Sequence, residues 1–290
     1  MNKIDIEKLK ESKSTAELLK FSIINIDKPS GPTSFQVSQF LKNALNITKT
    51  SHLGTLDPMV SGVLPIGLNR ACRLNEYLMH RDKTYVGIMR LHREIEKEKL
   101  EKVISSFLGK IMQMPPKRSR VKRALREREV KTFSIMEINE KDVLFETEVQ
   151  AGTYIRKICD DVGKEIGGAH MLELRRTKAG IFSEDKLYTL YQFEKAVEKY
   201  KNGSDNLLRE MLVPGEIVSQ LLPVITIHKQ VLKKCLAGSP IFHNFLLNEE
   251  EIKNIKKDDK ISIFCESKFV GCYKFINSSS VIAVPEFVFN

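Results

Sequence analysis

The chain has 290 residues, 42% hydrophobic and 29% charged, a composition that excludes an intrinsically disordered protein and fits about two globular domains. It contains no apolar run of the roughly 18–20 residues that a membrane span needs, and its first twenty residues lack the apolar core of a secretory signal. The five cysteines are odd in number and form no C-x-x-C motif, so we expect a cytoplasmic protein without disulfides or a zinc ribbon.

Spacing of apolar residues and turn residues predicts alternating strands and helices. We expect strands at 22–27, 84–91, 130–137, 142–149 and 170–177, and helices starting after Thr33 or Ser34, at 95–108, at 154–166 and within 187–213. Pro214-Gly215 marks a boundary, after which short strands are expected at 223–228, 260–265, 268–275 and 281–289, with a short helix at 229–236. This second module has about 70 residues, too few for a comfortable core of its own, so it is expected to pack on the rest of the chain.

The net charge of +10 indicates a polyanionic partner such as RNA or DNA. Residues 117–131 (KRSRVKRALREREVK) hold eight of the basic residues and only two acidic ones. Five of the eight are arginines, whose planar guanidinium group suits phosphate. This stretch is the predicted point of contact with nucleic acid.

The common catalytic signatures are absent from the sequence. There is no G-x-G-x-x-G opening a helix, no Walker A loop, no H-E-x-x-H and no G-x-S-x-G, and the six histidines show no metal-ligand spacing. Any reaction is therefore expected to proceed without a recognisable nucleotide cofactor or metal.

The loop SHLGTLDPMVSGVLP presents an acidic side chain in a restrained backbone. Gly54 permits a positive φ, and Pro58 keeps Asp57 out of the helical region. A carboxylate held in this way can act as a nucleophile or a general base, but it can also simply cap a turn, as Asp-Pro sequences commonly do.

Three further features favour the catalytic interpretation of Asp57. Tyr85 opens a predicted strand, Arg156 lies in GTYIRKICDD, and a pair of arginines, 175 and 176, lies in LELRRTKAG. A carboxylate, an aromatic ring and a guanidinium are what a site for an everted uracil would need. From spacing alone, Tyr85 also fits an ordinary strand residue, and Arg156 a solvated helix face.

Five motifs together resemble those of a known family. They are DKPSGPTS (27–34), HLGTLDP (52–58), KTY (83–85), AGTYIRKICDDVG (151–163) and GAHMLELRRTKAG (168–180). In order and spacing they resemble the TruB-type pseudouridine synthases and, within them, the dyskerin-like branch, the catalytic subunit of archaeal H/ACA guide-RNA particles. The resemblance implies isomerisation of uridine to pseudouridine in rRNA or tRNA, with no cofactor.

The resemblance also implies the architecture. It is an α+β fold in which residues 21–215 form a mixed, mainly antiparallel sheet flanked by helices, with a thumb-like loop at about 111–130. Residues 216–290 would form a small β-barrel-like PUA domain that binds RNA, with residues 1–20 packed on it. The implied partners are guide RNA, substrate RNA and the small H/ACA core proteins, with no membrane.

Individual residues acquire roles by the same resemblance. Asp57 would be the catalytic carboxylate, and the substrate would be bound by Tyr85, Arg156, Leu174 and His52. Structural support for the loop would come from Lys28, Pro29 and Gly54. RNA contacts are expected from Lys117, Arg118, Arg120, Lys122, Arg123 and Gly238.

Two other functions stay open at the level of sequence. One is a stand-alone synthase that modifies tRNA without a guide RNA. The other is a noncatalytic RNA-binding scaffold in ribosome assembly, in which Asp57 would be expendable. The sequence also leaves open whether Asp57 attacks the sugar or removes a proton from it.

Overall fold

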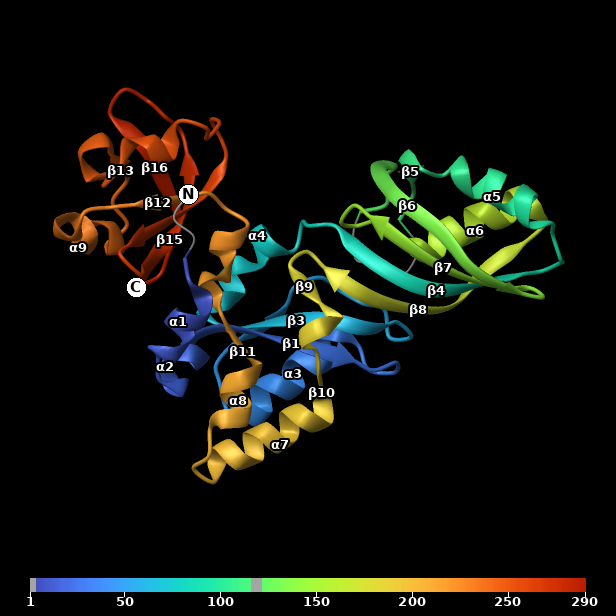
Figure 1. Ribbon diagram of the computed structural model, residues 1–290, viewed down its shortest axis with the longest axis horizontal. Helices are drawn as coiled ribbons and strands as arrows, with labels where there is room; N and C mark the ends of the chain where they lie inside the picture. The colour runs from blue at the N-terminus through green and yellow to red at the C-terminus, as the bar shows by residue number, and fades with distance from the viewer. Residues whose placement is uncertain (1–3, 116–121) are drawn as a thin grey trace.

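The computed structural model describes residues 4–115 and 122–290, and a large mixed sheet with helices packed against it dominates this part of the chain (Figure 1). The strands of its main path, in spatial order, are β10 (Tyr188–Thr189), β1 (Phe21–Lys28), β3 (Ser61–Asn69), β8 (Ala169–Ala179), β4 (Lys83–Leu91), β7 (Asp142–Val149), β6 (Arg126–Asn139) and β5 (Gly109–Gln113). Three short strands join it at the side: β11 (Leu212–Pro214) on β1, β2 (Thr50–His52) on β3, and β9 (Phe182–Ser183) on β8. Most of the pairs are antiparallel, so the expected α+β fold with a mainly antiparallel sheet is confirmed.

The helices follow the periodic apolar segments. Their bounds are α1 (Ile6–Glu11), α2 (Thr15–Lys20), α3 (Ser34–Leu45), α4 (Asn75–Leu78), α5 (Lys97–Ser105), α6 (Ile155–Ile166), α7 (Leu190–Lys201), α8 (Asn206–Met211) and α9 (Leu232–Leu236). Helix α3 begins where predicted because Thr33 and Gln36 form a capping box. Helix α6 buries Ile158, Cys159 and Val162 and ends at Gly167, which has a left-handed backbone.

Three predicted elements differ from those observed. Strand β6 begins at Arg126 rather than near residue 130, because it pairs with β5 in a hairpin that extends into the basic stretch. Helix α5 is shorter than 95–108 at both ends. The helical stretch within 187–213 is two helices, interrupted after Lys201 where Gly203 has a φ of +91°.

Two halves of the large sheet meet at the pair β3–β8. This contact is parallel and short, with Ser61 opposite Arg175 and Gly62 opposite Arg176. On one side lie β1 and β3 with α3, α7 and α8, and on the other lie β4 to β7 with α5 and α6 (Figure 1). The loop that leads into the start of β3, which carries Asp57, therefore lies next to residues from both halves of the sheet.

Gly62 makes the junction possible. Its φ is +100°, and a Cβ at this position would lie 2.2 Å from the backbone oxygen of Arg176.

We predict that Gly62→Ala lowers the free energy of unfolding by about 3 kcal/mol, because the two backbones must separate. Urea denaturation checks this. Gly203→Ala is the matched control, since its φ is +91° but nothing lies within 4 Å of the added Cβ; an equal loss in both variants would refute the argument from close approach.

The C-terminal module is a five-stranded sheet in the order β12 (Val224–Thr226), β14 (Lys260–Cys265), β15 (Lys268–Phe275), β16 (Val281–Val288) and β13 (Ile241–Phe242). It has its own apolar core, and it also packs on the large domain as predicted. The ring of Phe21 stacks on Phe269 and Phe289, with centroid distances of 5.4 and 4.3 Å. In Figure 1 the module (orange to red) lies beyond β1 and β3, away from the β5–β6 hairpin.

The described part of the N-terminal segment contacts the large domain and also the apolar cluster that the two domains share. Helices α1 and α2 contact β1, β11 and α8 of the large domain, and Leu18 and Leu19 belong to that domain's core. Thr15 donates a hydrogen bond to Asp205, and Lys10 donates to the backbone oxygen of Glu210 at 3.1 Å. Ile4 packs against the apolar cluster that Phe21 forms with Phe269 and Phe287 of the C-terminal module. The segment thus lies mainly on the large domain and reaches the cluster that the two domains share.

Candidate active site

The loop that carries Asp57 is tied down by the opening motif of the sequence. The buried Lys28 Nζ donates to the backbone oxygens of Pro29, Pro58 and Val60 at 2.9, 3.0 and 2.8 Å. The Ser34 hydroxyl accepts from Leu56 N at 2.8 Å and donates to Leu56 O at 2.9 Å. Because the backbone is fixed on both sides of Asp57, its side chain is presented in one geometry.

Asp57 forms an ion pair that joins the two halves of the sheet. Its Oδ2 lies 2.5 Å from Nη2 of Arg156, which is on the first turn of α6. The Asp57 side chain is 54% exposed and that of Arg156 is 46% exposed, so the carboxylate is accessible from solvent. A guanidinium in this place orients the carboxylate and balances its charge.

Tyr85 on β4 and Leu174 on β8 lie in the part of the sheet that packs against the Asp57 loop. Both side chains are 8% exposed and share a core cluster with Leu56 and Val60, which flank Asp57. Tyr85 on β4 stands opposite Arg176 on β8, and Arg176 stands opposite Gly62 on β3. The Asp57 loop enters the sheet at β3, β8 lies beside β3, and Tyr85 is on β4, the next strand after β8.

Arg176 connects this part of the sheet to the loop. It is 1% exposed, and it donates from Nε to Val63 O at 2.8 Å and from Nη2 to Gly54 O at 3.1 Å. Tyr85 stands opposite Arg176 on the neighbouring strand β4. Burial lowers the pKa of Arg176, and the electrostatic interaction with Tyr85 opposes that shift. One buried cation thus holds the loop backbone and interacts with Tyr85.

Two comparisons bear on the family. Residues 42–155 match the N-terminal domain of the TruB family pseudouridylate synthases, and residues 156–219 match the C-terminal domain of tRNA pseudouridylate synthase B. The chain is 40% identical over 271 residues to the "Probable tRNA pseudouridine synthase B" of Methanothermobacter thermautotrophicus, covering 92% of this chain and 83% of that protein. The chain belongs to the TruB family of pseudouridine synthases. It is therefore an RNA isomerase.

Other relatives of this TruB family enzyme are archaeal as well. The protein of the same name from Archaeoglobus fulgidus is 41% identical over 250 residues, which cover 86% of this chain and 76% of that one. Among solved structures, a "Cbf5-Nop10-Gar1 Complex" matches with a TM-score of 0.87 and 36% identity over 97% of this chain and 88% of that one. An "H/ACA RNP bound to a substrate RNA containing 2'-deoxyuridine" matches with a TM-score of 0.86 and 33% identity over 97% and 89%. These dyskerin-like neighbours agree with the resemblance seen in the motifs.

Two other predicted residues, His52 and Gly54, belong to the motif that carries Asp57, and Pro29 belongs to the motif that anchors it. His52 ends β2, and its Nε2 lies 3.2 Å from the Thr55 hydroxyl. Gly54 has a φ of +111°, the positive value that the turn was predicted to require. Pro29 lines a hollow of about 330 Å³ together with Lys28, Ser61 and Arg175.

The predicted RNA contacts are more widely spread. Lys122 and Arg123 are exposed at the end of the β5–β6 hairpin, whereas Gly238 lies in a turn of the C-terminal module, with a φ of +91°. Lys117, Arg118 and Arg120 lie outside the described residues. In the described part of the chain, no group of three or more His, Cys, Asp or Glu side chains is placed to hold a metal ion. No helix there is long and apolar enough to cross a membrane.

Sequence reasoning missed the buried cations beneath the loop. It noted the two arginines at 175 and 176 together, but only the fold separates them: Arg175 pairs with Asp27 at 2.9 Å near the surface, and Arg176 is internal. Lys83 is the other case. Its Nζ donates to the backbone oxygens of Met79 and Arg81 at 2.7 and 2.6 Å. The KTY motif contained this lysine, but its burial left no signal in the sequence.

Lys83 predicts a pH dependence of stability. Burial lowers its pKa from 10.5 to about 8, with Arg176 adding to the effect. Between about pH 8 and 10.5 the native protein has released this proton while the unfolded chain retains it, so stability rises with pH. We take the unfolding free energy of the wild type minus that of Lys83→Met. This signed difference should rise by up to about 3 kcal/mol between about pH 8 and 10.5 and stay constant below about pH 8. Urea titrations at pH 7 to 11 measure it, and a fall with rising pH would contradict the assignment.

Proposed function

We propose that this enzyme is the catalytic subunit of an archaeal H/ACA guide-RNA particle, acting on uridines in rRNA, with tRNA as a second substrate class. The observation that supports this most is the match, over 97% of the chain including the C-terminal module, to a Cbf5-Nop10-Gar1 complex and to an H/ACA RNP bound to a substrate RNA. The small core proteins named in those complexes are the proposed partners. The C-terminal module is proposed to be a PUA domain that binds the guide RNA, with Gly238 in one of its contact turns.

The proposed mechanism assigns a task to each side chain of the site. Asp57 supplies the carboxylate that reacts at the sugar or its protons while the N-glycosidic bond breaks. The uracil then rotates, its carbon 5 bonds to the sugar and releases its hydrogen as a proton to solvent, and N1 takes up a proton, so the net composition is unchanged. Tyr85 stacks on the everted base, and Arg156 orients the carboxylate. Stacking is worth about 1–3 kcal/mol, which offsets much of the few kcal/mol needed to extrude a base.

The other predicted residues act around this centre. His52 and Leu174 shape the pocket for the base, while Lys28, Pro29 and Gly54 keep the loop rigid. Lys122 and Arg123, with Lys117, Arg118 and Arg120, would hold the substrate RNA from the thumb. The half-exposed carboxylate suits this scheme because a large substrate can close the site itself.

A second candidate is a stand-alone enzyme that modifies tRNA directly. The observation in its favour is the name of the curated relatives, "Probable tRNA pseudouridine synthase B". The two candidates share the isomerase chemistry and differ only in how the substrate is positioned.

The deciding experiment is tritium release from [5-³H]uridine-labelled RNA. We would incubate the full chain with a target rRNA fragment or with tRNA, each with and without an H/ACA guide RNA and the small core proteins. Release from the rRNA fragment that requires the guide supports the first function. Release from tRNA without guide RNA, together with no release from the rRNA fragment under any condition, supports the stand-alone function and overturns the guided assignment.

A further inference from the structure

Two histidine rings meet on the surface where the end of β4 lies beside the start of β8. His92 directly follows β4 and His170 is the second residue of β8, and both residues are exposed. His92 Nε2 lies 3.1 Å from His170 Nδ1, and the planes of the two rings are 51° apart. The residues are 78 positions apart in the sequence, so only the pairing of β4 with β8 brings the rings together.

The backbone on both sides of this pair is fixed. Arg90 stands opposite His170 in the antiparallel pair of β4 and β8, and His92 N donates to Gly168 O at 2.9 Å. Gly168 has a φ of +119°, and a Cβ there would lie 2.2 Å from His92 Nδ1, so only glycine leaves room for the ring. The strand pairing and the glycine therefore hold the two rings at this separation.

The distance between the two nitrogens fits a shared metal ion. Zinc binds histidine nitrogen at about 2.0–2.1 Å, so two nitrogens on one tetrahedral zinc ion lie about 3.3 Å apart. A small rotation of the two exposed rings would point both lone pairs at one ion. The neutral rings would then carry their protons on His92 Nδ1 and His170 Nε2, so no proton is gained or lost when the ion binds.

The charges around the pair permit a bound cation. Arg90 donates to both carboxylate oxygens of Asp142, at 2.7 and 2.6 Å, so its charge is balanced. Asp142 also interacts electrostatically with His170. Arg93 donates to Ile166 O at 2.9 Å, at the C-terminal end of α6, where the helix dipole is negative. In the described part of the chain neither ring has a carboxylate at ion-pair distance, so no carboxylate competes with a metal ion for the rings.

The ligand type selects the class of metal. Imidazole prefers the later first-row divalent ions Ni²⁺, Cu²⁺ and Zn²⁺, whereas Mg²⁺ and Ca²⁺ take oxygen ligands. The five cysteine thiols, which could otherwise compete for zinc, are all buried. Because the described residues bring no third His, Cys, Asp or Glu side chain to the pair, water would fill the remaining coordination positions.

We propose that His92 and His170 chelate one late first-row divalent metal ion, with zinc as the expected occupant. The ion ties the end of β4 to the start of β8, and it stabilises the fold without taking part in the reaction.

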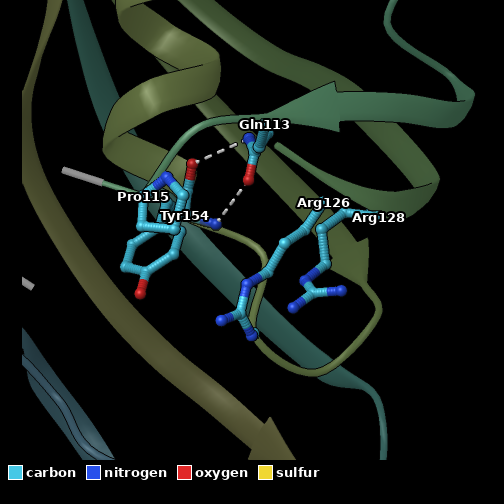
Figure 2. A pocket seen from close by; sticks show the side chains of 6 residues that line it. Gln113, Pro115, Arg126, Arg128 and Tyr154 are labelled. Carbon is cyan, nitrogen blue, oxygen red and sulfur yellow. Dashed lines mark hydrogen bonds between the residues drawn. The ribbon is translucent and has the colours of Figure 1, made fainter. Parts of the chain in front are cut away.

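The position of the pair separates it from the active site. It adjoins the C-terminal end of α6, whereas Arg156, the partner of Asp57, is on the first turn of that helix. That first turn is held independently, because the Gln113 side chain accepts from Tyr154 N at 3.0 Å and donates to Tyr154 O at 3.2 Å, as the dashed lines in Figure 2 show. We therefore expect the metal to change stability and to leave turnover unchanged.

The test is isothermal titration of zinc chloride into the full chain after treatment with EDTA. We expect one zinc ion per chain, and His92→Asn and His170→Asn should each weaken this binding at least about tenfold. Zinc at about a hundred times its Kd should raise the melting temperature of the wild type by about 5 °C, and neither variant should show this rise. Magnesium chloride should have no effect, and both variants should keep wild-type turnover in the tritium assay.

His228→Asn is the matched control, since it removes an exposed histidine of the C-terminal module and should leave zinc affinity and stoichiometry unchanged. Zinc binding that persists in both variants overturns the proposal, and so does the absence of saturable binding to the wild type. One zinc ion per two chains would assign the histidines to a contact between copies and overturn the chelate within one chain. A loss of turnover in a variant with wild-type melting would contradict the purely structural role.

Discussion

Asp57→Asn is expected to reduce uridine isomerisation by at least about a thousandfold while leaving the affinity for RNA nearly unchanged. The amide keeps the shape of the side chain but can neither attack carbon nor accept a proton as a carboxylate does. Binding should persist because the loop is held by Lys28 and Ser34 through backbone atoms, which the substitution leaves in place. Tritium release measures turnover, and filter binding measures affinity.

A matched control separates the loss of the reacting carboxylate from the general effect of removing one negative charge from an RNA-binding protein. Asp142→Asn removes a carboxylate that pairs with Arg90 at 2.6 Å on the far end of β4 and β7, so it should keep full turnover. If Asp57→Asn retained turnover but lost RNA binding, the catalytic assignment would be wrong and the loop would be a binding element.

The second large effect is expected at Arg176, which we treat as a positioning residue. Arg176→Lys should lower kcat about a hundredfold with a small change in KM, because a single ammonium cannot donate to both Val63 O and Gly54 O while it also interacts with Tyr85. Misplacement of the ring and the loop by about 1 Å is enough for a loss of this size. Steady-state kinetics and thermal melting are measured in parallel.

Tyr85→Phe distinguishes positioning from mere stability. It removes the hydroxyl that interacts with Arg176 but keeps the ring, so it should cost less than Arg176→Lys. The double variant should be no worse than Arg176→Lys alone, since both act through the interaction between Arg176 and Tyr85. Losses that multiply, or a kcat that follows the melting temperature alone across the three proteins, would show that Arg176 serves only the fold.

The elements that the sequence predicted best are those with strong local signals. Helix α3 has a capping box at Thr33, and α6 has an apolar face that ends at Gly167. Where neighbouring strands decide the outcome, prediction was poorer. Strand β6, for example, extends into the basic stretch because β5 pairs with it.

The site shows the same division. The sequence by itself determined the chemical groups: a carboxylate in a restrained loop, a tyrosine opening a strand, and an arginine at the start of a helix. Only the tertiary structure decided that α6 brings Arg156 to within 2.5 Å of Asp57, and that Arg176 is the buried member of its pair. The physical reason is that loop geometry and helix start depend on residues a few positions apart, whereas burial and the meeting of side chains 99 positions apart depend on how strands pair across the sheet.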